Sequence, residues 1–333
     1  MDVEGKTIAI TGAGGFVGLH MVQRCRERGM IVRGLDSCAG AVEAARNAGA
    51  EMIQGDVCDP EDAKRLCSGA DIVFHAAAIV HEGGDYVVFE KINVGGTRTM
   101  AAAASAAGVK RFIQVSSVMV YGFHYPDNIT EDGPLCGEDN SYCQTKIESE
   151  HAAIGFHRPG AMEVIVIRCG DIYGPRSNPW TVRPIEMMRQ NLFIYANGGR
   201  GIMNHVYIDN MLDAVFLALA KNVTGESFNI TDGQRTTFKE FFGNYAGMLG
   251  KRWLPSLPAG PLKLLIAMSN VVRKLFRQPI FITSEFIPYV TRVHCYSIEK
   301  SRRMLGYEPR VALEEGMRRI ASWLKTQPSG TGK

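Results

Sequence analysis

The sequence lacks the features that define several classes of protein. None of its apolar runs reaches the roughly 18–20 residues that a membrane-spanning helix needs. Neither sign of charge dominates, since Lys and Arg number 37 and Asp and Glu number 34, so the charge balance gives no reason to expect nucleic acid. The eight cysteines form no CxxC pair and no signal peptide is visible, which argues against a disulfide framework, a metal site and export. With an apolar fraction of 46% and no internal repeat, we expect a globular protein of the cytoplasm.

Three glycines form the strongest pattern near the start of the chain. Residues 7–11 are apolar or β-branched and predict a buried strand, and a helical pattern runs from residue 16 to about residue 28. Between them lie Gly12, Gly15 and Gly18. Gly12 permits a tight turn, Gly15 lets phosphates approach, and Gly18 lets the helix lie close to the strand. Such a turn brings backbone N–H groups and a helix N-terminus to one point, so it predicts a pyrophosphate site that also includes Phe16 and Val17.

A carboxylate after the second predicted strand indicates which dinucleotide binds. Asp36 follows the apolar segment 30–35 and stands 18 residues after Gly18. It can accept hydrogen bonds from both hydroxyls of an adenosine ribose, whereas it would repel a 2′-phosphate. Neither Ser37 nor Cys38 supplies an arginine for such a phosphate, and we expect Arg33 to point to the opposite side of the strand. The pattern therefore favours NAD over NADP.

The first half of the chain alternates strands with helices. We expect strands at about residues 7–11, 30–35, 51–54, 70–74, 111–115 and 163–168. This alternation predicts an α/β fold with a doubly wound parallel sheet of the Rossmann type, which binds ligands at the carboxyl ends of its strands. Further expected cofactor contacts follow the third and fourth strands: Asp56, Val57, Ala76, Ala77 and Ala78. Asp56 either reads the adenine amino group or caps the helix that starts after Pro60, and we expect His75 to be structural.

Ser117, Tyr142 and Lys146 form the expected catalytic group. Tyr142 and Lys146 are four residues apart and share one face of a predicted helix, and Ser117 ends a strand 25 residues before Tyr142. Hydride transfer between a carbinol carbon and nicotinamide requires a proton at the oxygen, which a tyrosine can exchange if its pKa drops toward neutrality. We expect the Lys146 ammonium and the positive nicotinamide ring to lower that pKa. Lys146 can also hold the nicotinamide ribose, and Ser117 can orient the reacting oxygen.

Asn93 lies in a predicted helix, residues 86–107, that also contains two glycines. Because glycine destabilises a helix interior, its presence suggests that another backbone approaches closely. Two interpretations of Asn93 stay open. It orders a water or a backbone segment near the active site, or it serves helix packing alone.

These motifs together resemble the extended short-chain dehydrogenase/reductase family. They occur in the family's order over about the first 230 residues: TGAGGFVG at 11–18, Asp36, GDV at 55–57, FHAAA at 74–78, NVGGT at 93–97, SSVMVYG at 116–122, YCQTK at 142–146 and IYGP at 172–175. The resemblance implies an NAD-binding domain over residues 1–175, to which the chain returns near residues 204–231. It also implies a smaller domain, mainly residues 176–326, that binds the substrate. It also implies catalysis by Ser117, Tyr142 and Lys146 with Asn93 as a further member, Pro175 near the nicotinamide amide, and a homodimer through the helices that bear Asn93 and Tyr142. Cys169 departs from the pattern, since the family commonly has proline there.

Two branches of this family compete for the substrate. Nucleotide-sugar epimerases and dehydratases usually bind the substrate pyrophosphate through an arginine, and this chain has Met203 at that position. Arg200 could replace the missing arginine. VYIDN at 206–210, the YxxTK form, the apolar-basic segment 261–281 and LGYEP at 305–309 resemble 3β-hydroxysteroid and sterol-4-carboxylate dehydrogenases. LGYEP decides little, since some nucleotide-sugar enzymes share it. We therefore favour alcohol–ketone oxidoreduction on a bulky apolar substrate, either a sterol or a long β-hydroxy or β-keto acid. A nucleotide-sugar enzyme is the alternative, and a nicotinamide-binding regulator without catalysis is a third.

Residues 261–281 stand apart because basic residues are interleaved with apolar ones, namely Lys263, Arg273, Lys274 and Arg277. The segment could cover an apolar substrate, lie on a membrane surface, or serve as a dimer or core helix. We expect residues 327–333 to form a flexible tail.

Overall fold

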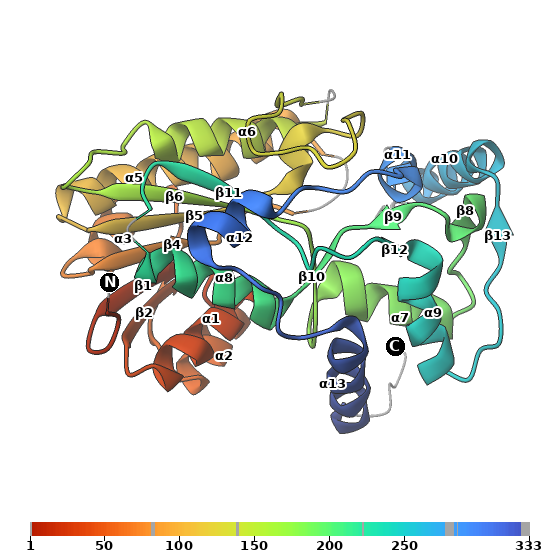
Figure 1. The fold of residues 1–333 in the computed structure, drawn as a ribbon, viewed down its shortest axis with the longest axis horizontal. Helices are drawn as coiled ribbons and strands as arrows, with labels where there is room; N and C mark the ends of the chain where they lie inside the picture. The colour runs from red at the N-terminus through yellow and green to blue at the C-terminus, as the bar shows by residue number, and fades with distance from the viewer. Residues whose placement is uncertain are drawn as a thin grey trace.

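The computed structural model describes residues 2–80, 84–137, 140–221, 223–276, 283–284 and 286–327. Residues 277–281 of the apolar-basic segment and all of the expected flexible tail except Gln327 lie outside these ranges. Figure 1 shows a larger part built on one sheet, beside a smaller part formed mostly by the second half of the chain.

A parallel sheet of seven strands forms the centre of the larger part, so the predicted doubly wound sheet is confirmed. The strand order is β11-β6-β5-β4-β1-β2-β3, and each neighbouring pair runs parallel. The order reverses beside β1, where such sheets bind their ligands. The strands are β1 (Thr7–Thr11), β2 (Ile31–Asp36), β3 (Glu51–Gln54), β4 (Ile72–His75), β5 (Arg111–Ser117), β6 (Glu163–Cys169) and β11 (Glu226–Ile230).

Helices cover both faces of this sheet, and successive side chains of a strand enter different cores. Ile8 and Ile10 of β1 pack toward α1 and α8, whereas Ala9 between them belongs to the core under α3, α5 and α6. Parallel strands buried on both faces are apolar along their whole length, which explains the continuous apolar runs in the sequence. The helices are α1 (Phe16–Glu27), α2 (Ala39–Asn47), α3 (Pro60–Cys67), α5 (Gly96–Ala106), α6 (Ser141–Ile154), α8 (Ile208–Ala220) and α12 (Glu299–Leu305).

The helix expected over residues 86–107 is interrupted. It consists of α4 (Tyr86–Phe89), a π-helical segment (Glu90–Gly95) and α5. The expected close approach concerns a side chain rather than a backbone, because a Cβ on Gly96 would lie 2.7 Å from a methyl carbon of Val57. Single π-helical turns inside α-helices are often found at functional sites.

The smaller part is assembled from short strands and helices. Two strands, β7 (Asp171–Tyr173) and β10 (His205–Tyr207), pair with each other rather than with the main sheet. The other elements are a π-helical segment (Asn178–Val182), α7 (Arg183–Arg189), β8 (Tyr195–Ala196), β9 (Ile202–Met203), β12 (Thr236–Thr237), α9 (Phe238–Met248), β13 (Ser256–Leu257), α10 (Ala259–Leu275), α11 (Phe286–Thr291) and α13 (Leu313–Thr326). Short 3-10 turns occur at Val118–Tyr121 and Asn197–Gly199.

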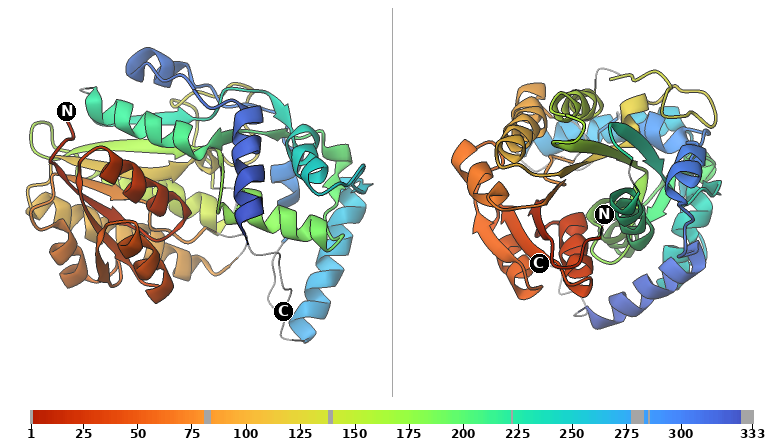
Figure 2. Two further views of the ribbon diagram at one scale, coloured as in Figure 1. Left: turned by 90° about the horizontal axis from the view of Figure 1, so that it is seen from below. Right: turned by 60° about the vertical axis from the view of Figure 1, so that its left-hand side comes forward.

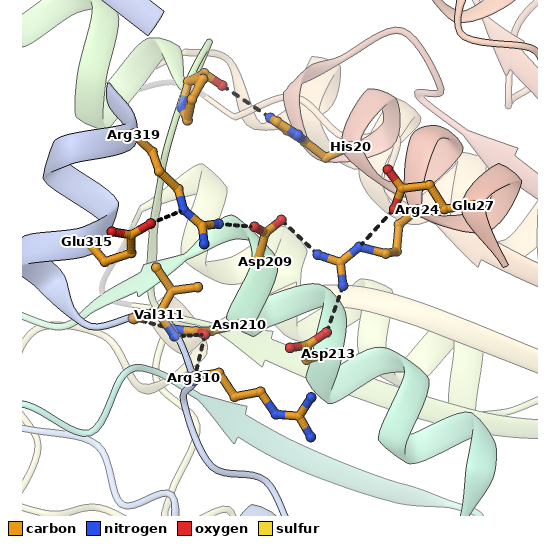
Figure 3. Close-up of polar contacts among 11 residues, drawn as sticks. His20, Arg24, Glu27, Asp209, Asn210, Asp213, Arg310, Val311, Glu315 and Arg319 are labelled. Atoms are coloured by element: carbon orange, nitrogen blue, oxygen red, sulfur yellow. Dashed lines mark hydrogen bonds and ion pairs between the residues drawn. The ribbon is translucent and has the colours of Figure 1, made fainter. Parts of the chain in front are cut away.

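A polar network joins the last helix to the nucleotide-binding part (Figure 3). Arg24 of α1 pairs with Asp209 and Asp213 of α8, each at 2.9 Å. Asp209 also accepts from Arg319 of α13 at 2.8 Å. An individual exposed ion pair contributes little to the free energy of folding. The shared carboxylate of Asp209 nevertheless connects α1, α8 and α13 in one network. No helix of the described chain has the length and apolar character needed to cross a membrane.

Candidate active site

A cleft with a volume of about 730 Å³ opens beyond the carboxyl ends of the strands. Most of the residues expected to hold the cofactor or react with the substrate line it: Gly12, Gly15, Phe16, Val17, Gly18, Asp36, Asp56, Val57, Ala76, Ala77, Ala78, Ser117, Tyr142 and Lys146. Of the residues expected to bind the cofactor or take part in catalysis, Asn93 and Pro175 are not among the described residues that line the cleft.

The glycine turn has the shape that a pyrophosphate requires. Gly12 adopts a φ of 64°, a conformation that side chains disfavour, and its carbonyl accepts from the N–H of Gly15 at 3.0 Å. A Cβ on Gly18 would clash with that same carbonyl, so α1 can approach the strand only without a side chain there. Gly15 is the N-cap of α1 and provides no side-chain cap, which leaves the first N–H groups of the helix facing the turn. The turn therefore fits an anion bound by backbone donors.

Asp36 is held at the end of β2 by two backbone donors. Its carboxylate accepts from the N–H of Gly14 and from the N–H of Cys38, both at 3.1 Å. Arg33 points away as predicted, since its guanidinium donates to the carbonyls of Arg65 and Ser68 at the end of α3. Among the described residues that line the cleft, the cations are Lys146 and Arg183. In the described structure this carboxylate is thus hydrogen-bonded to backbone N–H groups, and Arg33 is turned away from it.

Asp56 does not cap the following helix, so that interpretation was wrong. Asp59 is the N-cap of α3 and accepts from the N–H groups of Glu61 and Asp62. Asp56 instead accepts from the N–H of Cys58 at 2.9 Å and lines the cleft. Its role in reading adenine remains a prediction.

His75 is a structural residue, as predicted. Its Nδ1 lies 2.8 Å from the hydroxyl of Thr11, and its Nε2 lies 3.1 Å from the hydroxyl of Thr97. Burial lowers the pKa of His75 to about 3, so the ring is neutral at physiological pH. The Thr11 hydroxyl in turn accepts from the N–H groups of Ala76 and Ala77, which fixes the small residues beside the glycine turn.

Ser117, Tyr142 and Lys146 come together at the ends of β5 and α6. Asn140 starts α6 by accepting from the N–H groups of Tyr142 and Cys143, each at 3.1 Å. This cap places Tyr142 in the first turn, where its hydroxyl shares a hydrogen bond with the hydroxyl of Ser117. One turn later the buried Lys146 donates to the carbonyl of Val115 at 2.7 Å.

Burial dominates the electrostatics of this group in the protein alone. Burial raises the pKa of Tyr142, and the hydrogen bond with Ser117 only partly opposes that rise. Burial also lowers the pKa of Lys146 to about 8. The negative charge of the nearby Glu150 carboxylate opposes this decrease only in part. The ammonium of Lys146 is bound to the Val115 carbonyl. The phenol therefore keeps its proton in the protein alone. The lowering of the Tyr142 pKa that we expect from Lys146 together with a bound nicotinamide ring stays a prediction.

Asn93 holds backbone next to the cleft, which agrees with one of its two interpretations. Its side chain accepts from the N–H of Ile79 at 2.7 Å and donates to the carbonyl of Ile79 at 3.3 Å. It also donates to the hydroxyl of Thr145, the residue before Lys146, at 3.2 Å. The π-helical turn therefore ties α6 to the cleft-lining segment after β4. Its catalytic role stays a prediction.

Pro175 and Cys169 lie where the chain leaves the sheet. The carbonyl of Pro175 accepts from Nε2 of His20 in α1 at 3.2 Å. Cys169 lines the cleft, and burial raises the pKa of its thiol to about 12, so this departure from the family pattern adds no reactive nucleophile.

The far wall of the cleft is formed by segments that are far apart in the chain, and nothing in the sequence indicated that they lie together. It is largely apolar and aromatic: Met119, Phe123, Ile172, Pro179, Trp180, Phe286 and Tyr289, with Asn178, Asp171 and Arg183 among them. The ring of Trp180 stacks on Tyr289 with centroids 5.7 Å apart. Phe286 and Tyr289 were not predicted, because isolated aromatic residues far along the chain carry no motif. The half of the chain that contains Trp180 and Arg183 was expected to hold the substrate.

A buried ion pair joins the end of α11 to β7 within this wall. Arg292 donates to Asp171 at 2.7 Å, and its guanidinium lies 3.8 Å from the centre of the Tyr289 ring. The pair orients the ring of Tyr289 relative to β7. Met203 is buried in the core, and the exposed Arg200 does not line the cleft within the described chain. Neither therefore provides the pyrophosphate-binding arginine of the nucleotide-sugar enzymes.

Comparison with known proteins agrees with this geometry. Residues 8–231 match the model of the NAD-dependent epimerase/dehydratase family. Sterol-4-alpha-carboxylate 3-dehydrogenase, decarboxylating, of Mus musculus is 27% identical, with 95% of this chain and 90% of that protein covered. The 2-alkyl-3-oxoalkanoate reductase of Stenotrophomonas maltophilia is 28% identical, with 94% and 98% covered. The crystal structure of the dTDP-glucose 4,6-dehydratase DesIV from Streptomyces venezuelae, with NAD bound, has a TM-score of 0.78 at 25% identity, with 96% and 97% covered. The chain belongs to the NAD-dependent epimerase/dehydratase family, and the resemblance to extended short-chain dehydrogenases/reductases is confirmed.

Proposed function

We propose that this member of the family interconverts a secondary alcohol and a ketone on a bulky apolar substrate, a sterol or a long β-hydroxy or β-keto acid. The observation that carries the proposal is the aromatic and apolar wall of the cleft that Tyr142 also lines, which includes Trp180, Phe286 and Tyr289. Burying apolar substrate surface there supplies roughly 25 cal/mol per Å². The charged diphosphate of a nucleotide sugar would gain little from such a wall, because its binding needs cations or N–H donors.

The residues around Tyr142 have separable roles in this reaction. When bound, NAD or NADH supplies the carbon that accepts or donates the hydride. Tyr142 holds the proton that moves to or from the substrate oxygen, and Ser117 orients that oxygen through its hydroxyl. Lys146 provides the positive charge that stabilises the phenolate in the oxidation direction. The same tyrosine serves both directions, because it donates the proton in reduction and accepts it in oxidation.

We propose NAD rather than NADP as the cofactor. Asp36 supports this choice, because its carboxylate is fixed by Gly14 and Cys38 where a 2′-phosphate would have to lie. Arg33 is engaged with the carbonyls of α3 and cannot turn toward that phosphate without losing both hydrogen bonds.

Arg183 supports a substrate that carries a carboxylate. It lines the same wall as Trp180, and a guanidinium binds carboxylates through paired hydrogen bonds. The names of two relatives, a sterol carboxylate dehydrogenase and an oxoalkanoate reductase, describe substrates with such a group. With a carboxylate β to the new ketone, loss of CO₂ could follow oxidation without further catalytic residues.

The alternative is a nucleotide-sugar epimerase or dehydratase. The similarity to the dTDP-glucose 4,6-dehydratase favours it. Met203 and Arg200 argue against it, since the first is buried and the second lies outside the lining of the cleft in the described structure.

The test is an NADH-absorbance and thermal-shift screen of the purified chain with NAD. A 3β-hydroxysteroid, a long-chain β-hydroxy acid and a UDP-hexose would be compared. We expect NADH with one of the first two compounds. Stabilisation by the UDP-hexose, with an epimerised product and no net NADH, would instead establish the alternative. Cofactor binding without turnover of any compound would favour the regulator.

A further inference from the structure

Helix α10 presents its apolar side to solvent, the reverse of an ordinary surface helix. Of its residues Ala259–Leu275 only Leu262 is buried. Six large apolar side chains of the helix are between 46% and 77% exposed: Leu264, Leu265, Met268, Val271, Val272 and Leu275. Figure 2, left, shows α10 in light blue along the outside of the smaller part, with its end projecting beyond the fold. Exposed apolar patches of this kind mark interaction surfaces.

The exposed residues form one continuous stripe. Leu264, Met268, Val271 and Leu275 recur at intervals of four, three and four residues, which is the spacing of a single helix face. The opposite face holds the helix to the protein, since Leu262 and Ile266 pack in a small core with Ile287 of α11. The apolar stripe is therefore additional to the contact that the fold already uses.

The charges beside the stripe all have one sign. Lys263 and Lys274 are exposed and lie 11 residues apart, three helical turns along the same flank. Residues 259–276 contain no Asp or Glu. A helix with an apolar face and flanking lysines fits the interface of a bilayer that contains anionic lipids.

We propose that α10 docks this protein on the surface of an anionic membrane, with its apolar stripe among the acyl chains and Lys263 and Lys274 at the headgroups. A second copy of the chain fits this face less well. In a two-fold antiparallel pairing centred near Met268, Lys263 of one copy would meet Lys274 of the other, and like charges repel.

Docking would bring the cleft close to the membrane. The core that holds α10 includes Ile287 of α11, and the neighbouring Phe286 and Tyr289 of α11 line the substrate wall. The membrane proposal stands on α10 alone, so it does not depend on which substrate the cleft accepts.

The experiment is co-sedimentation of the full-length protein with phosphatidylcholine vesicles, with and without phosphatidylserine. We expect binding that increases with phosphatidylserine and weakens with salt. The double variant Met268→Glu/Val271→Glu should lose binding to both kinds of vesicle. Its matched control is Ile31→Glu/Leu192→Glu, which adds the same charge at apolar positions 51% and 56% exposed outside α10 and should bind as the unaltered protein does. Unchanged thermal unfolding of all variants shows that the fold is retained.

A second variant tests the lysines separately. Lys263→Gln/Lys274→Gln should weaken binding to phosphatidylserine vesicles about 5-fold per lysine while changing binding to phosphatidylcholine little. The proposal is overturned if the unaltered protein stays in the supernatant with both vesicles, or if Met268→Glu/Val271→Glu binds as well as its control. Self-association without vesicles that Met268→Glu/Val271→Glu abolishes would overturn it in favour of a second copy.

Discussion

The nucleotide side of the cleft and the substrate side are constructed differently. The nucleotide side consists of short motifs at the ends of neighbouring strands, and backbone geometry shapes it: Gly12 with its positive φ, Gly18 against a carbonyl, and Asp36 held by two N–H groups. The substrate side is formed by side chains from distant segments, such as Trp180 and Tyr289. A cofactor shared by a whole family suits a rigid local motif, whereas a wall of separate side chains can change with the substrate.

Tyr142 stands where the two sides meet, so its replacement should have the largest effect. In Tyr142→Phe we expect kcat to fall by about 10²- to 10⁴-fold, because the proton donor is lost. NAD affinity, measured by calorimetry, should remain nearly unchanged, since the phenyl ring is kept. A variant that retains turnover would refute the catalytic assignment.

Gly18→Ala should damage the nucleotide side alone. Its methyl group would meet the Gly12 carbonyl and push α1 away from the turn, which should weaken NAD binding by about 100-fold. The matched control is Gly40→Ala in α2, where no atom lies within 4 Å of the added carbon. Equal NAD affinity in the two variants would show that the close approach of α1 is not needed.

Asp36→Ser should alter the choice of cofactor without affecting the substrate wall. Losing the carboxylate removes both ribose hydrogen bonds and the repulsion of a 2′-phosphate. We expect the ratio of kcat/KM for NAD over NADP to fall by about 30-fold. The KM for the alcohol should stay the same, and an unchanged ratio would contradict the proposed preference for NAD.

Arg183→Gln is the corresponding change on the substrate side. If Arg183 binds a carboxylate, the KM for a β-hydroxy acid should rise by about 10-fold. An alcohol of the same chain length without the carboxylate provides the comparison, and its KM should not change. NAD affinity should be unaffected, and equal effects on both alcohols would argue that Arg183 acts through packing.

The smallest effect concerns pH and the buried His75. Its pKa is about 3 in the folded protein and near 6.5 when unfolded, so the unfolded chain binds more protons between these values. The free energy of unfolding should therefore decrease as the pH falls from about 6.5, with His75 contributing up to about 1.4 kcal/mol per pH unit. Denaturant titrations of His75→Asn should show a shallower decrease. The exposed His124→Asn is the control, and identical slopes in all three proteins would disprove the contribution.

The sequence alone determined the parallel sheet, the glycine turn, the outward direction of Arg33 and the shared face of Tyr142 and Lys146. Each depends on residues close together in the chain, where helical and strand periodicity control which side chains point together. The tertiary structure decided that burial raises the pKa of Tyr142 and that Phe286 and Tyr289 pack against Trp180. These outcomes depend on desolvation and on contacts between segments more than 100 residues apart, and neither quantity leaves a periodic pattern in the sequence.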